Sequence, residues 1–104
     1  MSEQMIKYKR NLKALARCSS DEARHVIQNA DDDFILALLD AVWTTLANKV
    51  TLLPEQLSTI RTVQPVLRRF AERDQRVEER RRWLLTQNGI LAIQTLMEIL
   101  QTRF

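Results

Sequence analysis

The sequence predicts an all-α protein in which residues 1–104 form a single domain. The expected architecture is a compact bundle of five or six short helices around a central apolar helix. Two observations favour this class. The chain has one glycine and two prolines among 104 residues, so few positions interrupt a helix. Apolar residues recur at spacings of three and four along most of its length, which is the period of a helix that buries one face.

Two helices are expected in the first third of the chain. The first runs over residues 3–17 and carries Leu12 and Leu15 on its apolar side. The sequence SSDE follows, in which Ser19 and Glu22 have the spacing of a capping box and can satisfy free backbone donors. A short second helix is therefore expected to begin at Ser19 and to end near residue 28.

The third helix is predicted over NADDDFILALLDAVWTTLANK. Its aspartates supply an N-cap and place negative charge at the positive end of the helix dipole. A helix that is apolar nearly all round is normally buried on every side, so this one is expected at the centre of the bundle. Its apolar residues are Phe34, Ile35, Leu38, Leu39, Val42, Trp43 and Leu46.

The fourth helix begins at Pro54, since proline is favoured as the first residue of a helix. Pro65 lies inside the same apolar pattern and lacks a backbone N–H, so the helix is expected to kink or divide there. The chain is then expected to turn near Asp74 and Gln75.

A fifth helix is predicted from Val77 to Gln87, with Asn88–Gly89 as its C-terminal stop, because glycine accepts positive φ. The last helix is predicted from Ile90 to about Thr102. One side of this helix carries a stripe of apolar residues, and Phe104 is the last residue of the sequence. If one small core cannot cover the stripe, it implies a dimer or a partner helix. Its members are Ile93, Leu96, Met97 and Leu100.

Charge is distributed in blocks. Residues 1–17 hold five basic groups against one acid, residues 18–60 hold two against seven, and residues 61–82 hold eight arginines against four acids. The net charges are +4, −5 and +4. Such a chain could attract a polyanion at two places. It could equally hold itself, or a copy of itself, together by charge.

Catalytic and metal-binding patterns are weak. His25 and Cys18 are the only histidine and cysteine, and one of each at a spacing of seven forms no recognisable nucleophilic site. A helix N-terminus can lower a thiol pKa, but a structural role for both residues is favoured. The three aspartates at 31–33 are better explained by capping than by a metal. We therefore expect no enzyme, no metal and no cofactor.

The cellular setting is expected to be intracellular. A lone cysteine suits a reducing compartment, and the N-terminal sequence MSEQMIKYKR lacks the apolar core of a secretion signal. No stretch approaches the ~20 apolar residues that cross a bilayer, so no membrane partner is expected.

The arginine-rich stretch is the candidate binding site. A solvated helix face, a phosphate-binding face and a surface for an acidic protein are the three alternatives. Glu78 lies at helical spacing from Arg81 and Arg82, and Glu79 from Arg82, so part of the guanidinium charge is answered within the helix. Trp43 and Trp83 are expected as core or interface anchors. The candidate residues for nucleic acid or an acidic partner are Arg61, Arg68, Arg69, Arg73, Arg76, Arg80, Arg81 and Arg82.

Two stretches, NADDDFILALLDAVWTTLANKVTLLPEQL and LRRFAERDQRVEERRRWLLTQNGILA, resemble small helical proteins of Polinton (Maverick) elements and adintoviruses. That family is compared with the basic core proteins of adenoviruses, which condense or accompany the packaged genome. The resemblance implies binding roles for the arginines from Arg68 to Arg82. The chain departs from the family at Pro65, at its single Gly89 where relatives often have a glycine pair, and in the acids that dilute the basic stretch.

Two functions follow. The first is a non-enzymatic, self-associating protein-interaction module of viral or mobile-element origin, whose partner is itself or another protein. The alternative is a genome-associated protein that binds duplex DNA without reading its sequence. The resemblance implies the host cytoplasm or nucleus, or a virion, as the location.

Overall fold

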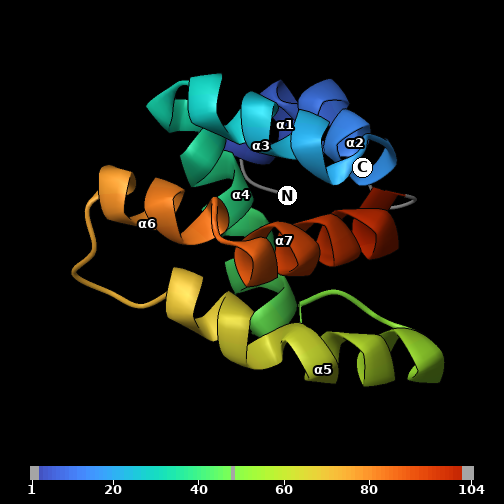
Figure 1. Ribbon diagram of the computed structural model, residues 1–104. Coiled ribbons are helices and arrows are strands. Elements are labelled where there is room, and N and C mark those ends of the chain that lie inside the picture. Colours follow the sequence, from blue (N-terminus) through green and yellow to red (C-terminus); the bar gives the residue numbers. More distant parts are fainter. Residues whose placement is uncertain (1–2, 48, 102–104) are drawn as a thin grey trace.

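Seven helices make up the computed structural model, which describes residues 3–47 and 49–101 (Figure 1). The predicted all-α class is confirmed, and no strand occurs within these residues. The C-terminal boundary expected near Thr102 and the expected terminal Phe104 lie outside the described residues. The helices are α1 (Glu3–Lys7), α2 (Lys9–Arg17), α3 (Ser20–Asn29), α4 (Asp32–Leu46), α5 (Pro54–Phe70), α6 (Val77–Leu84) and α7 (Gln87–Leu100).

The bundle is built around an apolar helix, as predicted, but that helix is α7 rather than α4. α7 packs against α2, α3, α5 and α6, and Figure 1 shows it between α1–α3 on one side and α5 on the other. α4 packs mainly against α1, α5 and α6. Its C-terminal half is less enclosed than expected, because Trp43 keeps 41% of its surface exposed.

The apolar stripe of α7 is covered by the chain itself. Ile93, Leu96, Met97 and Leu100 are all buried, so the exposed stripe that would require a partner helix is not present. Within α7, Leu91 is the large hydrophobic residue that remains exposed.

Side-chain caps begin helices where the sequence predicts them. The Ser19 hydroxyl accepts a hydrogen bond from Glu22 N at 3.2 Å, and Asp31 Oδ1 accepts one from Phe34 N at 3.0 Å. Pro54 is the first residue of α5. Each of these signals is local, since it satisfies or removes a backbone donor that the first turn leaves free.

The first predicted helix is divided at Tyr8, which raises the number of helices to seven. Tyr8 has φ −102° and ψ 18° and begins α2. Its hydroxyl donates to Asp31 at 3.0 Å, and its ring meets the Phe34 ring edge-on at 5.5 Å between centroids. These tertiary contacts with the start of α4 hold the junction, which explains why helical periodicity alone did not predict it.

Pro65 does not divide α5, which runs without a break from Pro54 to Phe70. Pro65 is exposed, as are Arg61 and Arg68 on the same side of the helix. The carbonyl that loses its backbone donor to a proline is that of the residue four positions earlier. It therefore lies on the wet face, where water can replace the missing bond.

Gly89 is not a helix stop. Thr86 Oγ1 accepts a hydrogen bond from Gly89 N at 3.0 Å as the N-cap of α7, and no glycine in the described residues has positive φ. A Cβ at Gly89 would collide with the carbonyl oxygen of Trp83 and lie 2.9 Å from Leu84 Cα. Glycine is required because the α6 backbone passes directly against α7.

Candidate nucleic-acid interface

Two of the eight candidate arginines point into the protein. Arg80 is 8% exposed, and its Nη1 donates to the carbonyl oxygen of Phe70 at 2.6 Å. Burial lowers the pKa of its guanidinium, and the Glu79 carboxylate opposes that shift. Arg80 therefore closes the C-terminus of α5, where the last carbonyls have no partner within the helix.

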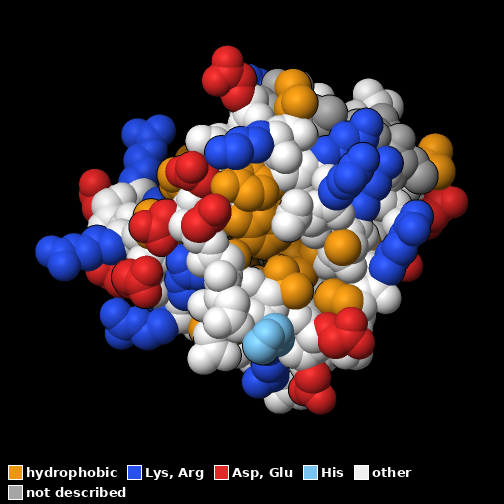
Figure 2. All heavy atoms as spheres, turned by 90° about the horizontal axis from the view of Figure 1, so that it is seen from above, with side chains coloured by type: hydrophobic (Ala, Val, Ile, Leu, Met, Phe, Trp, Pro, Cys, Tyr) orange, Lys and Arg blue, Asp and Glu red, His pale blue; other side chains and the backbone are white. Residues whose placement is uncertain are grey.

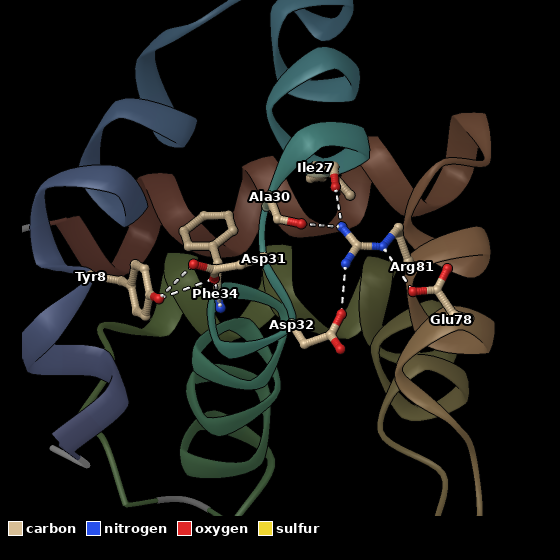
Figure 3. Close-up of polar contacts among 8 residues, drawn as sticks. All are labelled: Tyr8, Ile27, Ala30, Asp31, Asp32, Phe34, Glu78 and Arg81. Carbon is tan, nitrogen blue, oxygen red and sulfur yellow. Dashed lines mark hydrogen bonds and ion pairs between the residues drawn. The ribbon is translucent and has the colours of Figure 1, made fainter.

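Arg81 joins three helices (Figure 3). Its Nη1 donates at 2.7 Å to the carbonyl oxygens of both Ile27 and Ala30, at the end of α3. Its Nη2 lies 3.0 Å from Asp32 Oδ1 at the start of α4, and its Nε lies 3.6 Å from Glu78 Oε1. The guanidinium is therefore occupied by structural contacts rather than offered to a ligand.

The sequence contained a signal for this inward placement. Val77 and Leu84 are the apolar residues at the two ends of α6, and Arg80 and Arg81 lie at spacings of three and four from Val77. Positions at these spacings share the inward face of a helix. The two arginines thus occupy core-facing positions, although their charge had suggested that they were exposed.

The other six arginines are exposed, and we call them the arginine face. They lie on α5, on the turn that follows it and on α6. Among residues 3–47 and 49–101, none of them forms an ion pair within 4.0 Å. Their charge is therefore directed to solvent. The members are Arg61, Arg68, Arg69, Arg73, Arg76 and Arg82.

Two neighbouring shallow pockets follow this surface and meet at Arg69. Arg61, Arg68 and Arg69 line one along α5, together with Glu72. Arg69 and Arg82 line the other between α5 and α6, together with Gln75, Glu79, Trp83 and Thr86. Four guanidinium groups thus line the two pockets beside two acids. The Gln75 amide and the Thr86 hydroxyl already donate to backbone carbonyl oxygens. The guanidinium groups suit an extended anion, whereas the acids reduce the net positive charge of the surface.

Trp83 fixes the geometry of this surface. Its indole N–H donates to the carbonyl oxygen of Val66 at 3.2 Å, which ties α6 to α5. The Arg69 guanidinium lies 5.4 Å from the centre of its ring, within the range of a cation–π contact. Trp83 is the anchor between helices that the sequence predicted, whereas Trp43 is not a core residue.

The ion pairing predicted within α6 is confirmed for one of its two acids. Glu78 bridges to Arg81 at a spacing of three, whereas Glu79 has no ion pair within the described part of the chain. Since Arg81 is already buried, this pairing stabilises the fold and leaves the charge of Arg82 unanswered.

His25 and Cys18 do not come together. Exposed His25 lines a pocket with Tyr8, and its Nδ1 lies 3.4 Å from Asn29 Nδ2. Cys18 lines a different pocket beside Arg17. Burial and then the Glu22 carboxylate raise the pKa of the Cys18 thiol, so the depressed thiol pKa that a helix end could give does not occur.

The three aspartates have separate partners. Asp31 caps α4 and accepts the Tyr8 hydroxyl, Asp32 pairs with Arg81, and Asp33 lies 4.0 Å from Lys7 Nζ. The capping role predicted for them is confirmed at Asp31. Within the described residues, no three His, Cys, Asp or Glu side chains are grouped as metal ligands would be.

No helix in the described part of the chain combines the length and apolarity needed to cross a bilayer. Comparison of the chain with protein-family models, curated proteins and solved structures gave no match. The resemblance to proteins of Polinton elements and adintoviruses therefore stays a prediction.

Proposed function

We propose that this protein binds duplex nucleic acid through the phosphates, without reading base sequence, and that the arginine face makes the contact. The observation that carries this proposal is the exposure of six guanidinium groups that form no ion pair among the described residues. Guanidinium groups are planar and always charged, so they match phosphate oxygens with two parallel hydrogen bonds. The proposed role is non-enzymatic.

The shape of the surface supports phosphates as the target. The two pockets share Arg69, and Arg61, Arg68 and Arg69 are distributed along α5. A ligand with charges repeated along its length can contact several of them. Because Glu72 and Glu79 weaken the attraction between this surface and phosphates, we expect a moderate affinity. Because the contacts are to phosphates, we expect the affinity to fall strongly as salt concentration rises.

The proposed origin in a virus or mobile element rests on the resemblance to proteins of Polinton elements and adintoviruses. The basic stretch shared with that family includes five members of the arginine face, from Arg68 to Arg82. A genome-associated role inside a cell or a virion agrees with phosphate binding that ignores sequence.

A salt titration tests the proposal. If Arg61, Arg68, Arg69 and Arg82 each contact one phosphate, the logarithm of the binding constant falls with the logarithm of salt concentration at a slope of about −3.6. Fluorescence anisotropy of labelled duplexes of unrelated sequence measures this slope. Arg61→Gln with Arg68→Gln should reduce its magnitude by about 1.8. Both side chains are exposed and form no ion pair within the described residues.

The matched control removes the same charge elsewhere. Arg24→Gln with Lys49→Gln changes two exposed cations outside the arginine face, so duplex affinity should change little. The proposal fails if the wild-type protein binds no duplex at low salt. It also fails if the control pair weakens binding as much as the pair on α5 does. Binding of an acidic protein in place of duplex would assign the arginine face to a protein partner.

Self-association is the second candidate function. Leu53 and Leu57 are 57% and 40% exposed and lie four residues apart at the start of α5, where they form a small apolar surface. A dimer or larger species in light scattering, dispersed by Leu53→Ser with Leu57→Ser, would support this function. Leu91→Ser is the control, because Leu91 is exposed on a different helix. A monomer at high concentration would exclude it.

A further inference from the structure

A second cationic surface lies on α2. Arg10, Lys13 and Arg17 are separated by three and four residues and line one pocket together with Ala14, Cys18 and Glu22. The α2 sequence KRNLKALAR holds four basic residues and no acid. We call the surface made by Arg10, Lys13 and Arg17 the α2 face.

The charge of the α2 face is not used by the fold. None of its three residues forms an ion pair within 4.0 Å in the described part of the chain. Glu22 is the acid that lines the pocket, and its carboxylate accepts a hydrogen bond from the Ser19 hydroxyl at 3.3 Å. Two exposed cations, Arg10 and Arg17, and the half-buried Lys13 therefore lie beside one acid.

The α2 face and the arginine face point in different directions. α2 and α5 pack on opposite sides of α7 (Figure 1). Each turns apolar residues inward, Leu12 and Leu15 on α2 and Leu67 and Phe70 on α5, so the basic sides turn outward. Figure 2 looks onto the face that carries α1–α3 and shows one group of Lys and Arg side chains at its upper right and another along its left edge.

The size of the molecule separates the two surfaces. Its extents are 34 × 26 × 25 Å, so a straight duplex lying against α5 cannot also reach the outward side of α2. Two cationic surfaces on opposite sides of one small domain can, however, each hold a separate polyanion.

We infer that the α2 face is a second site for nucleic-acid phosphates, so that one molecule bridges two duplex segments. This inference rests on the proposed function and adds to it a bridging activity and the three residues that carry it. The chemistry is the same on both surfaces, since guanidinium and ammonium groups bind phosphate oxygens. The second site needs no second copy of the chain.

Two measurements on the same samples test the inference. Duplexes of about one helical turn, ~10 base pairs, are too short to wrap around the protein. Anisotropy of one labelled duplex reports binding, and energy transfer between donor-labelled and acceptor-labelled duplexes reports bridging. Wild-type protein should bind at most two duplexes and produce energy transfer when duplex is in excess.

The variants separate the two surfaces. Arg10→Gln with Arg17→Gln should bind one duplex through the arginine face and lose the energy transfer. Arg61→Gln with Arg68→Gln should also lose it, because only the α2 face then binds strongly. The control pair Arg24→Gln with Lys49→Gln, which removes the same charge, should keep both signals.

Each other outcome is decisive. Energy transfer that persists in Arg10→Gln with Arg17→Gln would overturn the inference and assign bridging to self-association. Duplex binding by the wild type without energy transfer would overturn bridging while leaving the proposed function intact. Absence of any duplex binding would remove both.

Discussion

Replacement of Arg81 tests whether neighbouring arginines of α6 have different roles, one in stabilising the fold and the other in binding a ligand. Arg81→Met keeps an unbranched side chain that reaches about as far as the arginine Nε, and it keeps a good helix-forming residue, but it removes the guanidinium that joins α3, α4 and α6. Arg82→Met is the matched control on the next residue, whose side chain is exposed and belongs to the arginine face. The two substitutions remove the same charge from the same helix.

The contacts of Arg81 set the expected magnitude. Its two hydrogen bonds to the carbonyl oxygens of Ile27 and Ala30 are both 2.7 Å long, and bonds from a charged donor contribute about 1.5–3 kcal/mol each. The side chains of Asp32 and Glu78 are 66% and 69% exposed, so these ion pairs add at most about 1 kcal/mol each. Since water can reach the freed carbonyls, we expect a loss near the lower end, about 3 kcal/mol.

Urea denaturation followed by circular dichroism measures this loss. A chain of this length has a free energy of unfolding of about 5–15 kcal/mol, so Arg81→Met should shift the midpoint strongly. Arg82→Met should stay within about 0.5 kcal/mol of the wild type. The loss should persist at ~1 M salt, where exposed ion pairs are screened. Equal stability of the two variants, or a loss that vanishes at high salt, would refute the assignment of Arg81 to the carbonyls of α3.

Three further predictions concern single residues. Gly89→Ala should lower the free energy of unfolding, measured by urea denaturation, by about 2 kcal/mol, because its Cβ meets the α6 backbone. Gly89→Asn should lower it further. If Gly89 were instead a left-handed helix stop, asparagine would be tolerated there. Tyr8, the single tyrosine, should titrate by absorbance above its ordinary pKa, because its partly buried ring disfavours the phenolate and Asp31 accepts its hydrogen bond. The stability due to this contact is present at pH values below the pKa of Tyr8 in the unfolded chain, and it is lost as pH rises through the higher pKa of Tyr8 in the folded protein. Asp31→Asn should lower the pKa of Tyr8 in the folded protein. An unchanged pKa would contradict the contact. Cys18 should react with an alkylating reagent more slowly in the folded than in the urea-unfolded protein, because burial and then Glu22 raise its pKa; equal rates would contradict this environment.

Local signals account for the part of the fold that the sequence predicted. The caps at Ser19 and Asp31 and the helix start at Pro54 each depend on a few neighbouring residues, so they could be recognised without tertiary information. The turn at Asp74 was also predicted, and its φ of 64° is a conformation that aspartate tolerates. The starts of α3, α4 and α5 and the all-α class followed from these signals and from periodicity, whereas the end of α6 and the start of α7 did not.

Tertiary contacts account for the features that were missed. Tyr8 interrupts a helical pattern because it packs on the start of α4, and Gly89 is glycine because another helix passes against it. The partners of Tyr8 lie more than twenty residues away. Trp83 and Leu84 are close to Gly89 in sequence, but the reversal of direction between α6 and α7 that brings their backbone against it was not predicted. Which helix lies at the centre also depended on packing, since α4 and α7 are both rich in apolar residues.

The ion pairs of the structure link the acidic and basic blocks of the sequence. The acidic middle is joined to both basic flanks within one chain, through Asp32 to Arg81 and through Asp33 to Lys7. Opposite charges from different blocks thus pair within one chain, as one of the alternatives left open by the block pattern requires, although the partly exposed pairs contribute little. These ties use one cation from each flank and leave the arginine face and the α2 face unpaired within the described residues. Because Arg81 and Lys7 belong to neither the arginine face nor the α2 face, stability and polyanion binding should be separable by substitution.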